Sequence, residues 1–356
     1  MHSSVSYMFI HCCSLFSLCL CTAYITVKAG SVARDVKTEV VTPALKCGEG
    51  PHWSSSEKVL YMVDTVGEKV LRYDPATNTT ASINIGGGQV TFIVPMKGDK
   101  NTFLISIQQC LNILTWHGRT SDFRLKQIAC VENDKPGHRL NDGKADCTGR
   151  LWTGTIGNEI SQGVFESFQG ALYSVENTFH IIRHYAGISI SNGIAWSPDH
   201  RTMYFIDSDA YRVYAFDFNS TSGHVSNMYT LVDFKKQNIS GFPDSMTVDR
   251  SGSLFVACYG GQQVIRVDPS NGRVLQEIKI PALDVTNVVF GGSNLDELYV
   301  TTASERASEE DKKRFPLTGH TFRLTGLGFQ GLPEYEFVYN PGQVKKKKYG
   351  GVLRRF

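Results

Sequence analysis

The chain contains 356 residues, of which 41% are hydrophobic and 20% charged, so it can bury a large core and is expected to be globular. The formal net charge of +2 gives no electrostatic support for a nucleic-acid-binding protein. Dense basic charge is confined to Lys345–Lys348 and Arg354–Arg355, and we interpret residues 341–356 as a solvated basic tail.

The N-terminal residues form an apolar run, Leu15–Ala23, that is too short to span a bilayer comfortably. Small residues near Ala23 and Gly30 suit signal-peptide cleavage, although no Lys or Arg precedes the run. We expect residues 1–29 to be a signal peptide, with no stable membrane insertion after cleavage; an uncleaved anchor or an unprocessed extension is the alternative. Secretion is therefore expected, with a cytoplasmic location as the alternative. Three glycosylation sequons support secretion; they begin at Asn78, Asn219 and Asn238.

Cysteine does not decide the compartment. The chain has nine cysteines, and the five beyond the expected signal peptide have no CxxC or zinc-site spacing. These are Cys47, Cys110, Cys130, Cys147 and Cys258. At most two disulfides can form among them, and buried unpaired cysteines are the simplest interpretation.

The body of the chain repeats one pattern: an apolar strand, a short polar break, a second strand and a turn rich in Asp, Asn and Gly. The first strands of the six repeats contain Leu60, Leu104, Leu151, Met203, Leu254 and Leu298. Their spacing of roughly 45 to 50 residues is typical of propeller blades. A blade cannot bury both faces of its sheet alone, so such units close around a channel. We therefore predict an all-β, six-bladed β-propeller over residues 37–340.

A polar junction precedes several of these strands. The clearest example is Arg139–Asp146, which we interpret as a turn that leads into a buried strand at Leu151–Thr155. Similar junctions occur at residues 47–53, 190–196, 241–246 and 284–289. Equivalent connections lie at the same end of a propeller, so we expect them to surround the mouth of the channel.

This arrangement brings together Glu49, Asn141, Asn192 and Asp244, which lie far apart in the sequence. Two carboxylates and two carboxamides form an oxygen site that suits Ca²⁺, Mg²⁺ or Mn²⁺, whereas Zn²⁺ is less favoured by the ligand type. The alternative is that each side chain only caps its own turn.

Several of these motifs, in this order, resemble the family of regucalcin, gluconolactonase and luciferin-regenerating enzyme. The resemblance rests on Gly-Glu-Gly-Pro at 48–51, Arg-Leu-Asn-Asp-Gly at 139–143, Ser-Asn-Gly at 191–193 and Pro-Asp at 243–244. It extends from about Val41 to Phe337. The chain departs from the family pattern at Ser245, at His320 and in the charged segment 305–314.

The resemblance implies a role for each matching residue. One divalent metal ion, Ca²⁺, Zn²⁺, Mg²⁺ or Mn²⁺, is expected to bind Glu49, Asn192 and Asp244. Arg139 and Asn141 are expected to bind a sugar lactone, and Glu159 is expected to contact it as well.

The implied function is hydrolysis of sugar lactones. The metal would polarise the lactone carbonyl, and Asp244 would be both ligand and general base. No serine nucleophile is required, and no Gly-x-Ser-x-Gly elbow occurs in the sequence. The alternatives are a calcium-binding regulatory propeller without turnover and a hydrolase of the luciferin-regenerating type.

Overall fold

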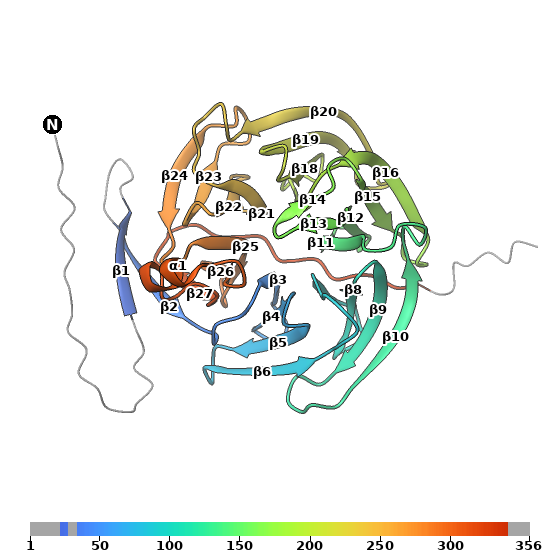
Figure 1. Cartoon of the computed structure of the whole chain (residues 1–356), viewed down its shortest axis with the longest axis horizontal. Helices are drawn as coiled ribbons and strands as arrows, with labels where there is room; N and C mark the ends of the chain where they lie inside the picture. The colour runs from blue at the N-terminus through green and yellow to red at the C-terminus, as the bar shows by residue number, and fades with distance from the viewer. Residues whose placement is uncertain (1–21, 28–33, 341–356) are drawn as a thin grey trace, which may run out of the picture.

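A computed structural model of the chain describes residues 22–27 and 34–340 (Figure 1). In this part of the chain, six antiparallel sheets of four or five strands surround a central channel. The predicted six-bladed β-propeller is confirmed. The tail at 341–356 and most of the expected signal peptide at 1–29 lie outside the described residues.

The strands of each blade are given from the channel outward. Blade 1 contains β3 (Gly48–Ser54), β4 (Val59–Asp64), β5 (Lys69–Asp74) and β6 (Thr79–Asn84). Blade 2 contains β7 (Ile93–Pro95), β8 (Thr102–Ile107), β9 (Cys110–Trp116) and β10 (Phe123–Cys130). Blade 3 contains β11 (Arg139–Ala145), β12 (Leu151–Ile156), β15 (Gly170–Val175) and β16 (Ile181–Ile188), and a hairpin of β13 (Glu159–Ser161) and β14 (Val164–Phe165) projects between β12 and β15.

The second half of the chain repeats this order. Blade 4 contains β17 (Ser191–Trp196), β18 (Thr202–Asp207), β19 (Arg212–Asn219) and β20 (His224–Asp233). Blade 5 contains β21 (Phe242–Val248), β22 (Leu254–Tyr259), β23 (Gln263–Val267) and β24 (Val274–Lys279). Blade 6 contains β25 (Asp284–Gly291), β26 (Glu297–Ala303), β27 (Phe322–Thr325), β2 (Arg34–Val40) and β1 (Thr22–Val27), with helix α1 (Glu309–Arg314) between β26 and β27.

The N-terminal part of the chain closes the ring. Strand β2 pairs antiparallel with β27, so that Val40 lies opposite Phe322 and Lys37 opposite Thr325. The first and last segments of the propeller therefore share one sheet. Among the described residues, no helix is long and apolar enough to cross a membrane.

The core lies between the blades. Six clusters of buried apolar side chains occur in the described part of the chain, one at each junction of neighbouring blades. At the junction of blades 5 and 6, Phe255 and Phe290 pack edge to face at 5.0 Å. Where blade 6 meets blade 1, Trp53 stacks on Tyr299 at 5.4 Å. Burial of each such side chain contributes roughly 1.5–3 kcal/mol, so the blades stabilise one another.

The interpretation of the polar junctions as turns is wrong. Arg139–Ala145 is strand β11, and the other junctions coincide with β3, β17, β21 and β25, the innermost strands of their blades. The strands expected to come first, such as the one containing Leu60, are second strands. The innermost strands escape recognition because they face a polar channel and therefore lack a continuous apolar pattern.

Each of these innermost strands contains a β-bulge near its N-terminal end. Pairing with the second strand is interrupted between Glu49 and His52, Leu140 and Gly143, Ser191 and Ile194, Pro243 and Met246, and Val285 and Asn287. A bulge adds an unpaired residue and changes the direction of side chains. The bulges allow polar side chains to point into the channel while both flanks of each strand stay paired.

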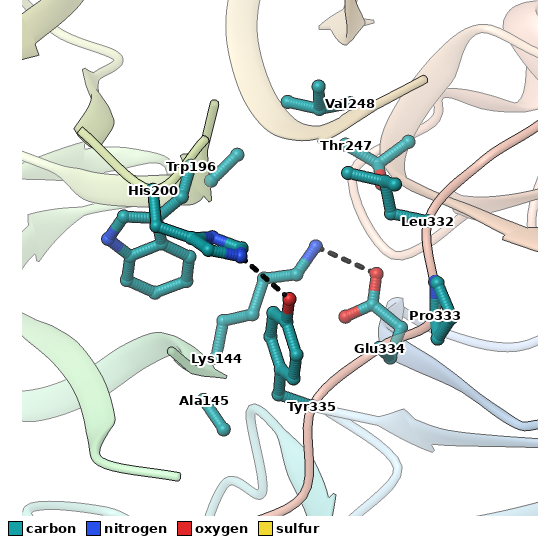
Figure 2. Close-up of a pocket in the computed structure, with 11 residues that line it drawn as sticks. Lys144, Ala145, Trp196, His200, Thr247, Val248, Leu332, Pro333, Glu334 and Tyr335 are labelled. Atoms are coloured by element: carbon teal, nitrogen blue, oxygen red, sulfur yellow. Dashed lines mark hydrogen bonds and ion pairs between the residues drawn. The ribbon is translucent and has the colours of Figure 1, made fainter. Parts of the chain in front are cut away.

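The C-terminal segment, residues 326–340, follows β27 and crosses the ring of blades (Figure 1). Isolated bridges join Gly331 to Asp249 and Phe337 to Met96, so the segment spans from blade 5 to blade 2. Figure 2 shows how it is fixed: the Lys144 ammonium lies 3.0 Å from Glu334, and Tyr335 shares a hydrogen bond of 3.1 Å with His200. The segment therefore closes the channel at the C-terminal ends of the innermost strands.

One disulfide occurs among the described residues. It joins Cys110 and Cys130, which face each other on β9 and β10. Cys47, Cys147 and Cys258 are free thiols. The simplest interpretation, that all five cysteines are unpaired, is therefore wrong for this pair.

Candidate active site

The bulged innermost strands place five of the six predicted site residues around one cavity, and the β13–β14 hairpin adds the sixth, Glu159. They are Glu49 on β3, Arg139 and Asn141 on β11, Glu159 on β13, Asn192 on β17 and Asp244 on β21. The cavity lies at the N-terminal ends of the innermost strands, the end of the channel opposite the C-terminal segment. Convergence of Glu49, Asn141, Asn192 and Asp244 thus arises from the repeat, because each lies near the N-terminal end of the innermost strand of its blade, in blades 1, 3, 4 and 5.

Hydrogen bonds fix the carboxamides of the site. The Asn141 Nδ2 group donates to the Ser191 carbonyl at 2.7 Å and to Asn192 Oδ1 at 2.6 Å. Asn192 Nδ2 in turn donates to Ser208 Oγ at 2.9 Å. The Arg139 guanidinium donates to Asn141 Oδ1. These contacts orient both amides, and Asn192 Oδ1, which accepts one hydrogen bond, keeps a second lone pair for a ligand.

A second network holds Glu49. Its Oε2 accepts hydrogen bonds from the Gly50 amide at 3.1 Å and from Asn287 Nδ2 at 3.0 Å. Asn287 Nδ2 also donates to Asp142 Oδ1 at 3.3 Å, and the Ser245 hydroxyl donates to the other oxygen of Asp142. Blades 1, 3, 5 and 6 are therefore linked below the cavity through buried polar side chains.

The carboxylates of the site destabilise one another in their ionised forms. Burial, together with the nearby Asp142 carboxylate, raises the pKa of Glu49 to about 8. Burial raises the pKa of Asp142 to about 6. The pKa of Asp244 is raised well above its usual range, first by burial and then by Glu49 and Asp142. Within the described chain, the Asp244 carboxylate has no hydrogen bond or ion pair, although its residue is only 5% exposed.

These features fit a hard divalent cation. A buried carboxylate without a partner is costly, and a cation beside Asp244 and Glu49 would offset that cost. The described residues contain no cluster of three His, Cys, Asp or Glu side chains placed to hold a metal ion. A metal here would therefore need a carboxamide oxygen, that of Asn192, as a third ligand. Such an all-oxygen set suits Ca²⁺, Mg²⁺ or Mn²⁺ better than Zn²⁺.

Known proteins resemble this chain over most of its length. Residues 47–304 match the family described as "SMP-30/Gluconolactonase/LRE-like region". Regucalcin of Xenopus laevis is 37% identical over 305 residues, which is 85% of this chain and 99% of the relative. The chain belongs to the SMP-30/gluconolactonase family. Regucalcin of Homo sapiens is 36% identical over the same fractions of the two chains.

Solved structures of the SMP-30/gluconolactonase family share its fold. A luciferin-regenerating enzyme superposes with a TM-score of 0.80 at 36% identity, covering 84% of this chain and 98% of its own. A calcium-binding protein, regucalcin from Agrobacterium tumefaciens, gives a TM-score of 0.75 at 25% identity, with 84% and 96% coverage. A gluconolactonase from Xanthomonas campestris gives 0.65 at 18% identity, which supports the fold alone.

Glu159 differs from the other predicted residues of this family member. It lies on the projecting β13–β14 hairpin, at the rim of the cavity, and its side chain is 39% exposed. Its Oε1 accepts a hydrogen bond from the Gly163 amide at 2.6 Å and another from Arg306 Nη2 at 3.1 Å. Glu159 thus approaches the cavity from outside the channel.

Sequence reasoning missed three functional candidates in this SMP-30/gluconolactonase family member. Asn287 lies in the recognised junction of blade 6 but was not assigned, and Asp142 directly follows Asn141. Both could have been found by treating every polar residue of the repeated motif as channel-facing. Arg306 gives no such signal, because its partner Glu159 lies 147 positions earlier in a different blade.

Proposed function

We propose that the protein is a divalent-metal-dependent hydrolase of sugar lactones. One observation carries the proposal: the unpaired Asp244 carboxylate shares a cavity with Glu49 and with the linked pair Arg139 and Asn141. A structural ion needs ligands but no adjacent hydrogen-bonding pair for a substrate. Family membership supports the same activity.

The residues divide into two groups. Glu49, Asp244 and Asn192 would hold the cation, which when bound polarises the lactone carbonyl and stabilises negative charge on its oxygen. Asp244 would accept a proton from the attacking water, because the cation would keep its carboxylate ionised and the carboxylate lines the cavity that the water enters. Arg139 and Asn141 would orient the ring through a fixed guanidinium fork and a carboxamide.

A panel of aldonolactones tests this proposal. Purified protein is assayed before and after chelation, and Ca²⁺, Mg²⁺, Mn²⁺ or Zn²⁺ is then restored one at a time. We expect turnover that is lost on chelation and recovered with at least one cation. Turnover that is unaffected by removal of all metal would contradict the proposed chemistry.

A calcium-binding regulatory role is the second candidate. It is favoured by a specific relative, since the Agrobacterium structure is described as a calcium-binding protein. This candidate predicts Ca²⁺ binding without hydrolysis of any lactone in the panel. Calorimetric titration of Ca²⁺ beside the turnover assay separates the two functions.

We also propose that the protein is secreted. The Cys110–Cys130 disulfide suits an oxidising compartment, and the three sequon asparagines, Asn78, Asn219 and Asn238, are all exposed. Expression in a secreting eukaryotic cell should release into the medium a shortened product that begins between Ala23 and Gly30 and that loses mass on glycosidase treatment. A cytosolic product that retains Met1 would overturn the proposal.

A further inference from the structure

Arg306 crosses the mouth of the cavity. It lies in the connection between β26 and α1, in blade 6, and it reaches Glu159 of blade 3 with an Nη2 to Oε1 distance of 3.1 Å. Its Nε also lies 3.8 Å from Glu305. Arg306 and Glu159 both line the cavity and their side chains are 30% and 39% exposed, so their ion pair forms a bridge between blades 6 and 3 at the rim of the cavity.

An aromatic ring and a glycine strengthen this bridge. Two guanidinium groups lie over the Phe165 ring, with Arg306 Cζ 5.7 Å and Arg139 Cζ 5.9 Å from its centroid. Arg306 also passes over the tip of the hairpin, where a Cβ added at Gly163 would lie 3.3 Å from its Nη1. Arg306 thus holds both ends of the β13–β14 hairpin.

The bridge also sets the direction of the Glu159 carboxylate. Its Oε1 is occupied by the Gly163 amide and Arg306, whereas its Oε2 has no hydrogen bond among the described residues. One oxygen is therefore fixed by the protein, and the other is available to a hydroxyl donor in the cavity. A free glutamate on an exposed hairpin would instead sample many rotamers.

We propose that Arg306 is a positioning residue that closes the cavity mouth and orients Glu159 for substrate hydroxyl groups. The closing function follows from geometry alone, whereas the orienting function rests on the lactone hydrolase activity proposed above. The contacts of Arg306 are partly exposed, with 30% of its side chain accessible, so the mouth can open and close readily. Arg306 would then affect substrate binding more than the chemical step.

Cys47 provides a probe of the mouth that does not depend on activity. This free thiol lines the same cavity and is partly exposed, whereas Cys258 is fully buried in blade 5. We compare the labelling rates of Cys47 by iodoacetamide and by a larger, also uncharged N-arylmaleimide, using peptide mass spectrometry. The ratio of the two rates cancels changes in the thiolate fraction, to which both reagents respond. Cys258 is the internal control for unfolding.

Three variants are tested. Arg306→Ala removes the bridge, and Arg306→Lys keeps the charge but not the planar group that packs on Phe165. Lys312→Ala is the matched control, because Lys312 lies on α1, carries the same charge and pairs at 2.9 Å with the exposed Glu309, away from the cavity. From the usual strength of a partly exposed ion pair plus a cation–π contact, we expect Arg306→Ala to raise the maleimide-to-iodoacetamide ratio about three- to tenfold.

The kinetic result completes the test. With the lactone that the wild type hydrolyses best, Arg306→Ala should raise KM about three- to tenfold with kcat changed less than twofold, Arg306→Lys should be intermediate, and Lys312→Ala should match the wild type in both assays. An unchanged labelling ratio in Arg306→Ala overturns the closing function whether or not the protein is a lactonase. A raised ratio in a protein that hydrolyses no lactone supports the closing function while the proposed activity fails. A raised ratio with unchanged KM, or a loss confined to kcat, overturns the orienting function.

Discussion

Replacing Glu49 by glutamine should stabilise the metal-free protein while weakening its binding of a cation. The substitution preserves shape, and the glutamine carbonyl oxygen can still accept the hydrogen bonds from the Gly50 amide and Asn287. What it removes is a buried carboxyl group beside Asp142, which must take up a proton or stay charged when the metal-free protein folds. The protein would gain stability because the glutamine amide needs no such proton uptake.

The size of the gain follows from the pKa of Glu49, which rises from 4.5 to about 8 on folding. The folded protein keeps the proton up to about pH 8, whereas the unfolded chain releases it near pH 4.5, so stability is lost as pH rises through this interval. At about 1.36 kcal/mol per pH unit, the loss at pH 7 is about 3 kcal/mol. The variant avoids this loss, which corresponds to a melting temperature roughly 6 °C higher in a domain of this size.

Thermal denaturation at pH 5, 7 and 8, with chelator and with excess cation, measures the effect. In chelator, the advantage of Glu49→Gln over the wild type should grow as pH rises. A cation at a hundred times its Kd would stabilise the wild type by about 2.7 kcal/mol and the variant by less, so the advantage should shrink or reverse. Glu310→Gln, an exposed substitution on α1, is the control for loss of one surface carboxylate.

Two results would refute this reasoning. If Glu49→Gln melted below the wild type in chelator at pH 8, the Glu49 charge would be compensated by the protein itself. If excess cation raised the melting temperatures of both proteins equally, Glu49 would not be a ligand.

Three further predictions concern other residues. Asp244→Ala should reduce lactone turnover by at least about a hundredfold while the protein stays folded by circular dichroism, and a comparable rate would exclude Asp244 as base and ligand. Arg139→Lys should keep metal affinity in calorimetric titration but lower turnover at saturating metal; a loss of affinity as large as that of Glu49→Gln would make Arg139 a residue that holds the ligands. Cys110→Ser should lower the free energy of unfolding by about 3 kcal/mol, and reductant should produce the same change in the wild type; no response to reductant would show that the pair with Cys130 does not form.

The repeat made much of the site predictable from sequence. Glu49, Asn192 and Asp244 occupy equivalent positions in their blades, and rotational repetition brings equivalent positions together. The sequence could not show that these positions are strands, since Asn, Asp and Gly favour turns locally. The channel overrides that preference, because its polar interior removes the need for alternating apolar residues.

Other features depend on contacts that have no local sequence signature. Strand β2 joins β27 although nearly the whole propeller separates them in the chain. The pair of Arg306 and Glu159 similarly depends on where two loops from different blades end. A repeat specifies how many blades there are and which ends coincide, but irregular loops take their positions from the assembled ring.

Within the described residues, the C-terminal segment covers one end of the channel, and the cavity lies at the other end. If the protein hydrolyses lactones as proposed above, lactone and acid product would both cross the rim near Glu159 and Arg306, since the pair of Lys144 and Glu334 lies at the opposite end of the channel. A product that is slow to leave would therefore occupy the route by which the next substrate enters. An acidic product would also pass Glu159 and Glu305 at this rim, where Arg306 lies close to both, so its exit would depend on the balance of these charges.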